Sequence, residues 1–282
     1  MNEFLELLFK VSVYTFVVVG MVSMGLKLTV TRIVTPLKNF KLILLALLAN
    51  FVFSPLLVYV LIYFIPVSEA EKTAFLILSV AAGAPFLPKL AEIAKSDIAY
   101  ATGIMLLLMI ITVFFMPFAL PVMLPGTEVN SFAIARSLVV LMIIPLILAL
   151  LFRHKFEKLA NILFKPTKII TDVSLLLLMV ALVGLNYENL ISMIGTGLLA
   201  IVLLMIGTTV IGYFLGGSDP DKKVVMSLCT GQRNISAALL VAAQNFKNKE
   251  IILTLVAISI IGLLMRVPYA RWIGNKVAEK RV

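Results

Sequence analysis

The chain has 282 residues, of which 62% are hydrophobic and 13% are charged, and its formal net charge is +10. A soluble globular protein contains about 45–50% apolar and about 25% charged residues, so this composition excludes that class and indicates a membrane protein. The apolar runs are long and unbroken, which favours an all-α membrane protein over a β-barrel with its alternating segments of about ten residues. We expect residues 1–282 to form a single transmembrane domain.

Nine stretches come close to the length of about 20 apolar residues that a membrane-spanning helix needs. In chain order they cover residues 4–26, 40–65, 73–97, 98–124, 131–152, 165–186, 190–215, 224–246 and 250–273. An odd number of crossings places the two termini on opposite sides of the membrane. Most of the lysines and arginines between the spans fall on the side of the C-terminus, and the opposite side holds only Lys72, Arg136, Lys247 and Lys249. The positive-inside rule then predicts an outer N-terminus and a cytoplasmic C-terminus in the cell (inner) membrane. Since the positive charge follows this topology, we expect the lipid bilayer and no nucleic acid as a partner.

The third and eighth spans are interrupted. The third contains GAPFLPKLAEIAK (residues 83–95), and the eighth contains CTGQRNISAAL (residues 229–239). Spans one to four and six to nine form two sets of four that enter the membrane from opposite faces, which predicts an inverted repeat with each interrupted span third in its set. A pair of Gly- or Pro-interrupted spans at corresponding positions is the sequence pattern that points to a carrier's binding site.

The two breaks contain the residues that we expect to form the site. Pro85 and Pro88 remove backbone donors and push the preceding residues toward extended geometry. Freed backbone groups cannot face lipid, so they must line an enclosed cavity, where half-helix ends offer partial charges. The alternative is that the prolines only kink a packed helix. If the two breaks cross, the substrate and crossover residues are Gly83, Pro85, Pro88, Lys89, Gly231, Gln232, Arg233 and Asn234.

Three of the cations inside the spans bear on the site. A lysine or arginine in the middle of a membrane costs about 2.5–3.5 kcal/mol even on the lenient insertion scale, and usually lines a pathway or pairs internally. Lys89 and Arg233 fit that description, and the alternative for each is a bond to carbonyls freed by the opposite break. Arg266, near the cytoplasmic end of the ninth span, is expected to snorkel or to pair.

Nearly the whole chain resembles the bile acid:sodium symporter family. The resemblance rests on MGLKLT at the end of the first span, the proline-broken third span followed by LAEIAKSDIAYA, and GQRNISAALLVA in the eighth. It implies a core of residues 40–124 and 190–273 that carries two crossing discontinuous helices, and a panel of residues 4–26 and 131–186. The substrate is expected between core and panel, with alternating access by movement of one against the other.

The chain departs from the family at the sodium sites that the resemblance implies. Pro88 stands at the position expected to hold an asparagine of the sodium-coupled members. Aligned on Asn234, their glutamate becomes Cys229 and their glutamine becomes Arg233. The ion-site equivalents in this chain, where the sodium ligands are lost, are Leu87, Pro88, Cys229, Thr230 and Arg233.

We therefore expect Lys89 and Arg233 to replace the sodium ions. Two unit charges 4 Å apart repel each other by about 4 kcal/mol at an effective dielectric of 20, which disfavours sodium beside either cation. A desolvated lysine beside an arginine could also load and release a proton, so proton coupling and a passive tether stay open as alternatives, and no other cofactor or metal is expected.

The sequence thus predicts a secondary transporter of a small amphipathic organic anion, such as a bile acid or carboxylate. The alternatives are a sodium-coupled symporter of the same family and a membrane ligand sensor that does not transport. An enzyme is not expected, because the spans hold no nucleophile–base set and no metal cluster. The oligomeric state is open, and a monomer is compatible with this scheme.

Overall fold

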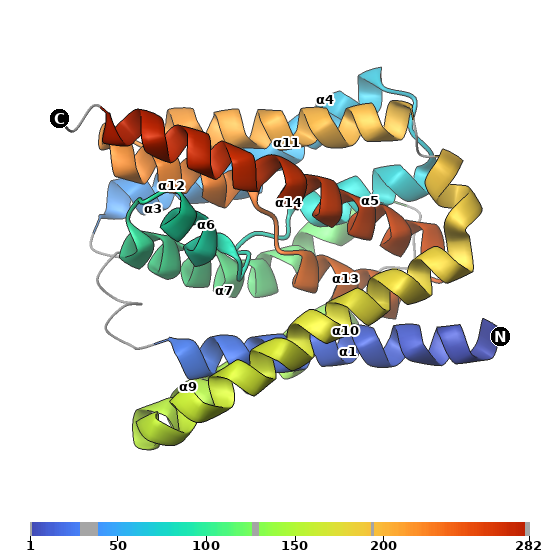
Figure 1. Ribbon diagram of the computed structural model, residues 1–282. Helices are drawn as coiled ribbons and strands as arrows, with labels where there is room; N and C mark the ends of the chain where they lie inside the picture. Colours follow the sequence, from blue (N-terminus) through green and yellow to red (C-terminus); the bar gives the residue numbers. More distant parts are fainter. Residues whose placement is uncertain (1, 29–38, 126–129, 193–194, 280–282) are drawn as a thin grey trace.

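The computed structural model describes residues 2–28, 39–125, 130–192 and 195–279, and over these residues every element is helical (Figure 1). Residues 193 and 194, in the predicted seventh span, lie outside them. In chain order the helices are α1 (Asn2–Lys27), α3 (Phe40–Leu48), η2 (Ala49–Phe53), α4 (Ser54–Phe64), α5 (Glu69–Ser79), α6 (Leu87–Ile93), α7 (Ile98–Met123), α8 (Ser131–Leu138), η3 (Val139–Ile143), α9 (Ile144–Lys155), α10 (Glu157–Ser192), α11 (Thr196–Leu215), α12 (Pro220–Gly231), α13 (Ile235–Asn245) and α14 (Lys249–Ala278).

Seven helical stretches in the described residues are long and apolar enough to cross a membrane. They are Phe4–Lys27, Phe40–Phe64, Ile98–Met123, Ser131–Lys155, Thr196–Leu215, Pro220–Asn245 and Lys249–Val277. The all-α membrane class is confirmed. The predicted third span is divided between α5 and α6, and the predicted sixth lies within α10. The count of nine crossings and the inverted repeat therefore remain predictions.

The helices lie in two groups (Figure 1). α1 packs along α10 and α9, at the lower edge of the figure, whereas α11 packs on α12 and α4, and α14 packs on α5, α12 and α6. The groups meet where α8 contacts α7 and α13, where α1 contacts α13 and where α14 contacts α10. The start of α1 and the end of α14 lie at opposite ends of the bundle. We call α1, α8, η3, α9 and α10 the panel helices and the others the core helices.

A π-helical turn shapes the second span. In η2 the backbone N–H of Ser54 bonds to the carbonyl of Ala49, five residues earlier, and Pro55 follows directly in the first turn of α4. Proline has no N–H to continue the regular ladder, and single π turns accommodate such interruptions. The turn carries Asn50, whose side chain is fully buried among apolar helices. An amide in that position needs polar partners, and these come from the two breaks.

Candidate functional site

The first break is the segment between α5 and α6. Helix α5 begins with a capping box between Ser68 and Glu71 and ends at Ser79, and α6 begins at Leu87 with Pro88 in its first turn. Gly83 has φ = +77°, and an alanine there would place its Cβ 2.6 Å from the Cα of Met109 in α7. The break thus passes so close to α7 that only glycine fits, in a conformation that glycine adopts freely.

The second break separates α12 from α13. Helix α12 ends at Gly231, Gln232 is extended, and Asn234 caps α13 by accepting a hydrogen bond from the N–H of Ala237 at 3.2 Å. Asparagine is a favoured N-cap because its side-chain oxygen satisfies an N–H of the first helical turn. This capping places Arg233 and Asn234 at the point where the chain changes direction.

Hydrogen bonds join the two breaks. The Asn234 N–H donates to the carbonyl of Ala81 at 2.8 Å, and its side-chain Nδ2 donates to the carbonyl of Gly83 at 3.2 Å. The Thr112 hydroxyl of α7 accepts from the N–H of Ala82 at 2.9 Å and donates to the Ala82 carbonyl at 3.1 Å. These bonds satisfy backbone groups of the first break that no helix can pair.

Arg233 lies between the two breaks, and it is 4% exposed. Its Nε donates to the carbonyl of Leu78 at 3.1 Å, and Nη2 donates to the carbonyl of Ser79. Its Nη1 lies 2.7 Å from Oδ1 of Asn50, and Nη2 lies 3.3 Å from the Asn50 carbonyl. The guanidinium therefore binds the carbonyls at the end of α5, which is the alternative role that the sequence left open.

Asn50 is a site residue that the sequence reasoning missed. Its Nδ2 donates to the carbonyl of Ala46 at 2.9 Å and approaches the Thr230 hydroxyl at 3.4 Å. The Thr230 side chain is fully buried on α12. The sequence did carry a signal for Asn50: it is a single amide side chain inside an otherwise apolar span. Polar side chains within a membrane almost always face a polar partner.

Lys89 does not lie at the crossing. Its side chain is 51% exposed, and its Nζ pairs with Oε2 of Glu92 at 3.0 Å. The expectation of a desolvated lysine beside Arg233 was wrong. The reason is the rotation of α6, which buries Leu87, Leu90 and Ala91 and turns the opposite face outward.

Of the other predicted residues, some lie at the crossing and some do not. Cys229 is a buried free thiol on α12, one helical turn before Arg233. Gln232 is half-buried, and its Oε1 has no hydrogen-bond partner. Pro85 precedes α6 and Pro88 lies in its first turn, and both are half-buried. No hydrogen bond of the described residues joins either proline to the second break.

Arg266 of α14 also departs from expectation. It neither snorkels nor pairs: the side chain is 4% exposed, and no atom of the described residues accepts a hydrogen bond from its Nε or Nη2. It lies close enough to Arg233 for the two positive charges to repel. No carboxylate in the described part of the chain forms an ion pair with either guanidinium.

One comparison with known proteins finds a match. The sequence model described as the Sodium Bile acid symporter family matches residues 14–193, which is more than half of the chain. The matched range includes the first break and ends before the second. No curated protein matches the sequence.

Proposed function

The chain belongs to the Sodium Bile acid symporter family, and on that premise we propose that it carries a small amphipathic organic anion across the membrane without sodium. The family is one of membrane transporters, so the chain is a multi-pass membrane transporter and not an enzyme. The substrate class, the independence from sodium and the route are the proposed part.

The position of Arg233 carries the proposal. Sodium requires several oxygen ligands and a charge to balance it, and the carbonyls of Leu78 and Ser79 and the side chain of Asn50 are already bound to the guanidinium. The glutamate that the resemblance implies at Cys229 is absent. A fixed cation bound to these oxygens disfavours a second cation beside it.

The exposed face of α6 supports an anionic substrate. The Glu92 carboxylate interacts with Lys89 on the same helix, and also with Lys27 at the end of α1 and Lys168 of α10. Three positive charges against one negative therefore lie between α6 and the panel helices. Such a charge distribution raises the local concentration of an organic anion and speeds its arrival.

Contacts between panel and core at the opposite end support alternating access. Near the start of α1, Lys249 Nζ of α14 lies 2.5 Å from Oε1 of Glu6, at the end that the positive-inside rule predicts to be outside. Further along α1, the Tyr14 hydroxyl accepts a hydrogen bond from Gln244 Nε2 of α13 at 3.4 Å. The proposal therefore treats this conformation as closed to the outside.

Uptake into proteoliposomes tests the proposal. A thermal-shift screen of bile acids and carboxylates identifies a stabilising anion, which is then radiolabelled and offered with an inward sodium gradient, with potassium in its place, and across a range of pH. We expect saturable uptake that is the same with sodium and potassium. Strict sodium dependence would overturn the proposal, and binding without counterflow would favour a sensor.

A further inference from the structure

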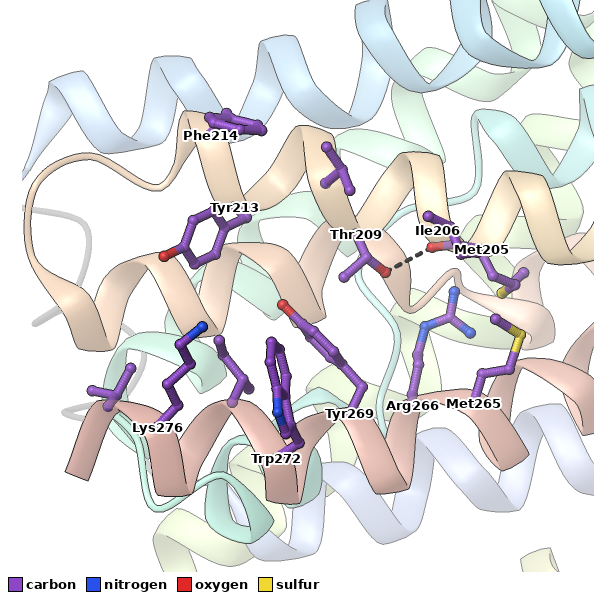
Figure 2. Close-up of a pocket in the computed structure, with 13 residues that line it drawn as sticks. Met205, Ile206, Thr209, Tyr213, Phe214, Met265, Arg266, Tyr269, Trp272 and Lys276 are labelled. Atoms are coloured by element: carbon purple, nitrogen blue, oxygen red, sulfur yellow. Dashed lines mark hydrogen bonds between the residues drawn. The ribbon is translucent and has the colours of Figure 1, made fainter. Parts of the chain in front are cut away.

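A cavity of about 410 Å³ lies between α11 and the second half of α14 (Figure 2). Its lining includes Met205, Thr209 and Tyr213 of α11 and Arg266, Trp272 and Lys276 of α14. It is bounded by core helices only, and none of the residues of the first break lines it. It adjoins the second break, where Arg266 lies beside Gly231, and it is separate from the space between α6 and the panel.

The guanidinium of Arg266 faces this cavity. Figure 2 shows it directed from α14 toward α11, beside Met205 and Thr209. The Thr209 hydroxyl donates to the Met205 carbonyl at 2.7 Å, and it does not accept a hydrogen bond from Nε or Nη2 of Arg266. Two of the three guanidinium nitrogens, Nε and Nη2, are buried without an acceptor.

The guanidinium of Arg266 fits between α11, α12 and α14 because two glycines, which have no side chain, lie beside it. A Cβ at Gly231 would lie 3.2 Å from Nε of Arg266, and a Cβ at Gly262, one turn earlier on α14, would collide with Nη1. The fold thus encloses a charged group that it does not neutralise. A buried charge without a partner is strongly unfavourable, and Arg233 adds a like charge nearby.

The rest of the cavity is apolar at the level of Arg266 and becomes amphipathic toward the end of α14. Met205, Ile206 and Met265 line the cavity at the level of Arg266. Lys276 stands about 15 Å further along the helix at a rise of 1.5 Å per residue, with its Nζ 5.1 Å from the centre of the Trp272 ring. A ligand that fits needs an anionic group for the arginine and an apolar body for the walls.

We propose that this cavity binds an amphiphile whose anionic headgroup is held by Arg266 and whose apolar body lies along Trp272. A carboxylate or phosphate can accept two hydrogen bonds from the edge of a guanidinium that carries Nε and Nη2. That edge of Arg266 is fully buried, so binding includes a turn of the guanidinium into the cavity. The same chemistry is found in a free organic anion and in an anionic lipid of the bilayer. The site does not depend on the proposed function, because it concerns binding and not transport.

Trp272 is the only tryptophan of the chain, and it lines this cavity while 56% of its surface stays exposed, so its fluorescence reports on the cavity and on the surrounding lipid. The full-length protein in phosphatidylcholine nanodiscs is titrated with 11-bromoundecanoate, whose bromine quenches tryptophan on contact, and with the uncharged 11-bromoundecanol. We expect saturable quenching by the acid. The alcohol should give only the gradual collisional quenching of a lipid-exposed ring. Equal quenching curves for the acid and the alcohol would overturn the proposal without recourse to any variant.

Two variants test whether the quenching by the acid depends on Arg266. Arg266→Gln should raise the half-saturating concentration of the acid about tenfold or more, because it removes charge-assisted hydrogen bonds. The matched control is Arg271→Gln on the same helix, where the arginine is exposed and outside the lining, and it should leave the curve unchanged. Identical curves for the two variants would overturn the proposal.

A second arm distinguishes the sources of the ligand. The nanodiscs are prepared with brominated phosphatidylglycerol or brominated phosphatidylcholine in place of the free acid. Quenching by the anionic lipid that exceeds that of the zwitterionic lipid and depends on Arg266 assigns the site to a lipid headgroup. Arg266-dependent quenching by the free acid alone assigns it to a soluble anion, and no Arg266 dependence in either arm refutes the site.

Discussion

Nη1 of Arg233 lies 2.7 Å from Oδ1 of Asn50, across 183 positions of the sequence, and both side chains are almost wholly buried. The bond joins the second break to the π-helical turn of the second span. Because Nη2 reaches the Asn50 backbone as well, one guanidinium fixes the positions of α5, η2 and the second break relative to one another.

Asn50→Leu in η2 should destabilise the protein more than a conservative change in the flanking helices α3 and α4. It leaves Nη1 of Arg233 without its acceptor, and hydrogen bonds to charged groups contribute about 1.5–3 kcal/mol each. The free energy of unfolding, measured by SDS titration, should fall by about that amount. Asn245→Leu is the matched control, since that amide bonds only within its own helix. Equal losses for the two variants would show that the bond to Arg233 contributes nothing specific.

Thr112→Val should loosen the first break while preserving the shape of the side chain. The change leaves both the N–H and the carbonyl of Ala82 without a partner, at about 1–3 kcal/mol for a buried unsatisfied group. Thr102→Val on the same helix removes only a bond to the Ile98 carbonyl one turn earlier, so its effect should be smaller. Thermal unfolding of both variants in detergent checks this, and a larger shift for Thr102→Val contradicts it.

Substitutions in the Lys89–Glu92 pair should change substrate affinity in opposite directions. With the transported anion identified, Lys89→Gln should raise KM and Glu92→Gln should lower it, each by up to about fivefold, as expected for exposed charges. The matched control is Lys72→Gln, which breaks a similar pair with Glu69 at the far end of the same interrupted segment. If KM moves the same way in both α6 variants, the face of α6 does not steer the anion.

The cap of α12 should make stability depend on pH. Burial raises the pKa of the Asp219 carboxyl, but hydrogen bonds from the N–H groups of Lys222 and Asp221 and the ammonium of Lys222 outweigh it, so the pKa lies below its ordinary value. This carboxylate therefore stabilises the folded protein above the unfolded pKa, and the contribution is lost as pH falls through the folded pKa.

Asp219→Asn keeps an oxygen acceptor but removes the charge. The difference in thermal stability between the natural protein and this variant should be constant from about pH 7 to about pH 5 and shrink at lower pH, near the carboxyl range. Asn248→Ser, at the uncharged cap of α14, provides the control and should show a difference that does not change with pH. A gap for Asp219→Asn that persists unchanged to acid pH would contradict the role of the charge.

The positions of both breaks could be predicted from the sequence because glycine and proline act locally. A proline cannot continue the backbone ladder wherever it stands, and Gly83 and Asn234 have the backbone preferences of a turn and a cap. The same reasoning reached Arg233, since a cation inside a span needs oxygen acceptors and a broken helix supplies them.

The partners of these residues could not be predicted, because they depend on packing between distant segments. Lys89 was misplaced although Leu87, Leu90 and Ala91 already showed which face of the short α6 would be buried. Arg266 was expected to snorkel or to pair because it stands near the cytoplasmic end of the ninth span. The structure covers it with α11, and no pattern within α14 signals that cover.

Because Arg233 is part of the protein, it affects the net charge that each transport cycle moves. A co-transported sodium ion is released together with the anion and cancels its charge. The guanidinium of Arg233 stays with the protein when the anion is released. If the anion crosses alone, each cycle moves net negative charge, and the membrane potential contributes about 2.3 kcal/mol per charge per 100 mV. In a cell that is negative inside, this electrical work opposes import and drives export, so the sign of the current would reveal the direction in which the transporter runs.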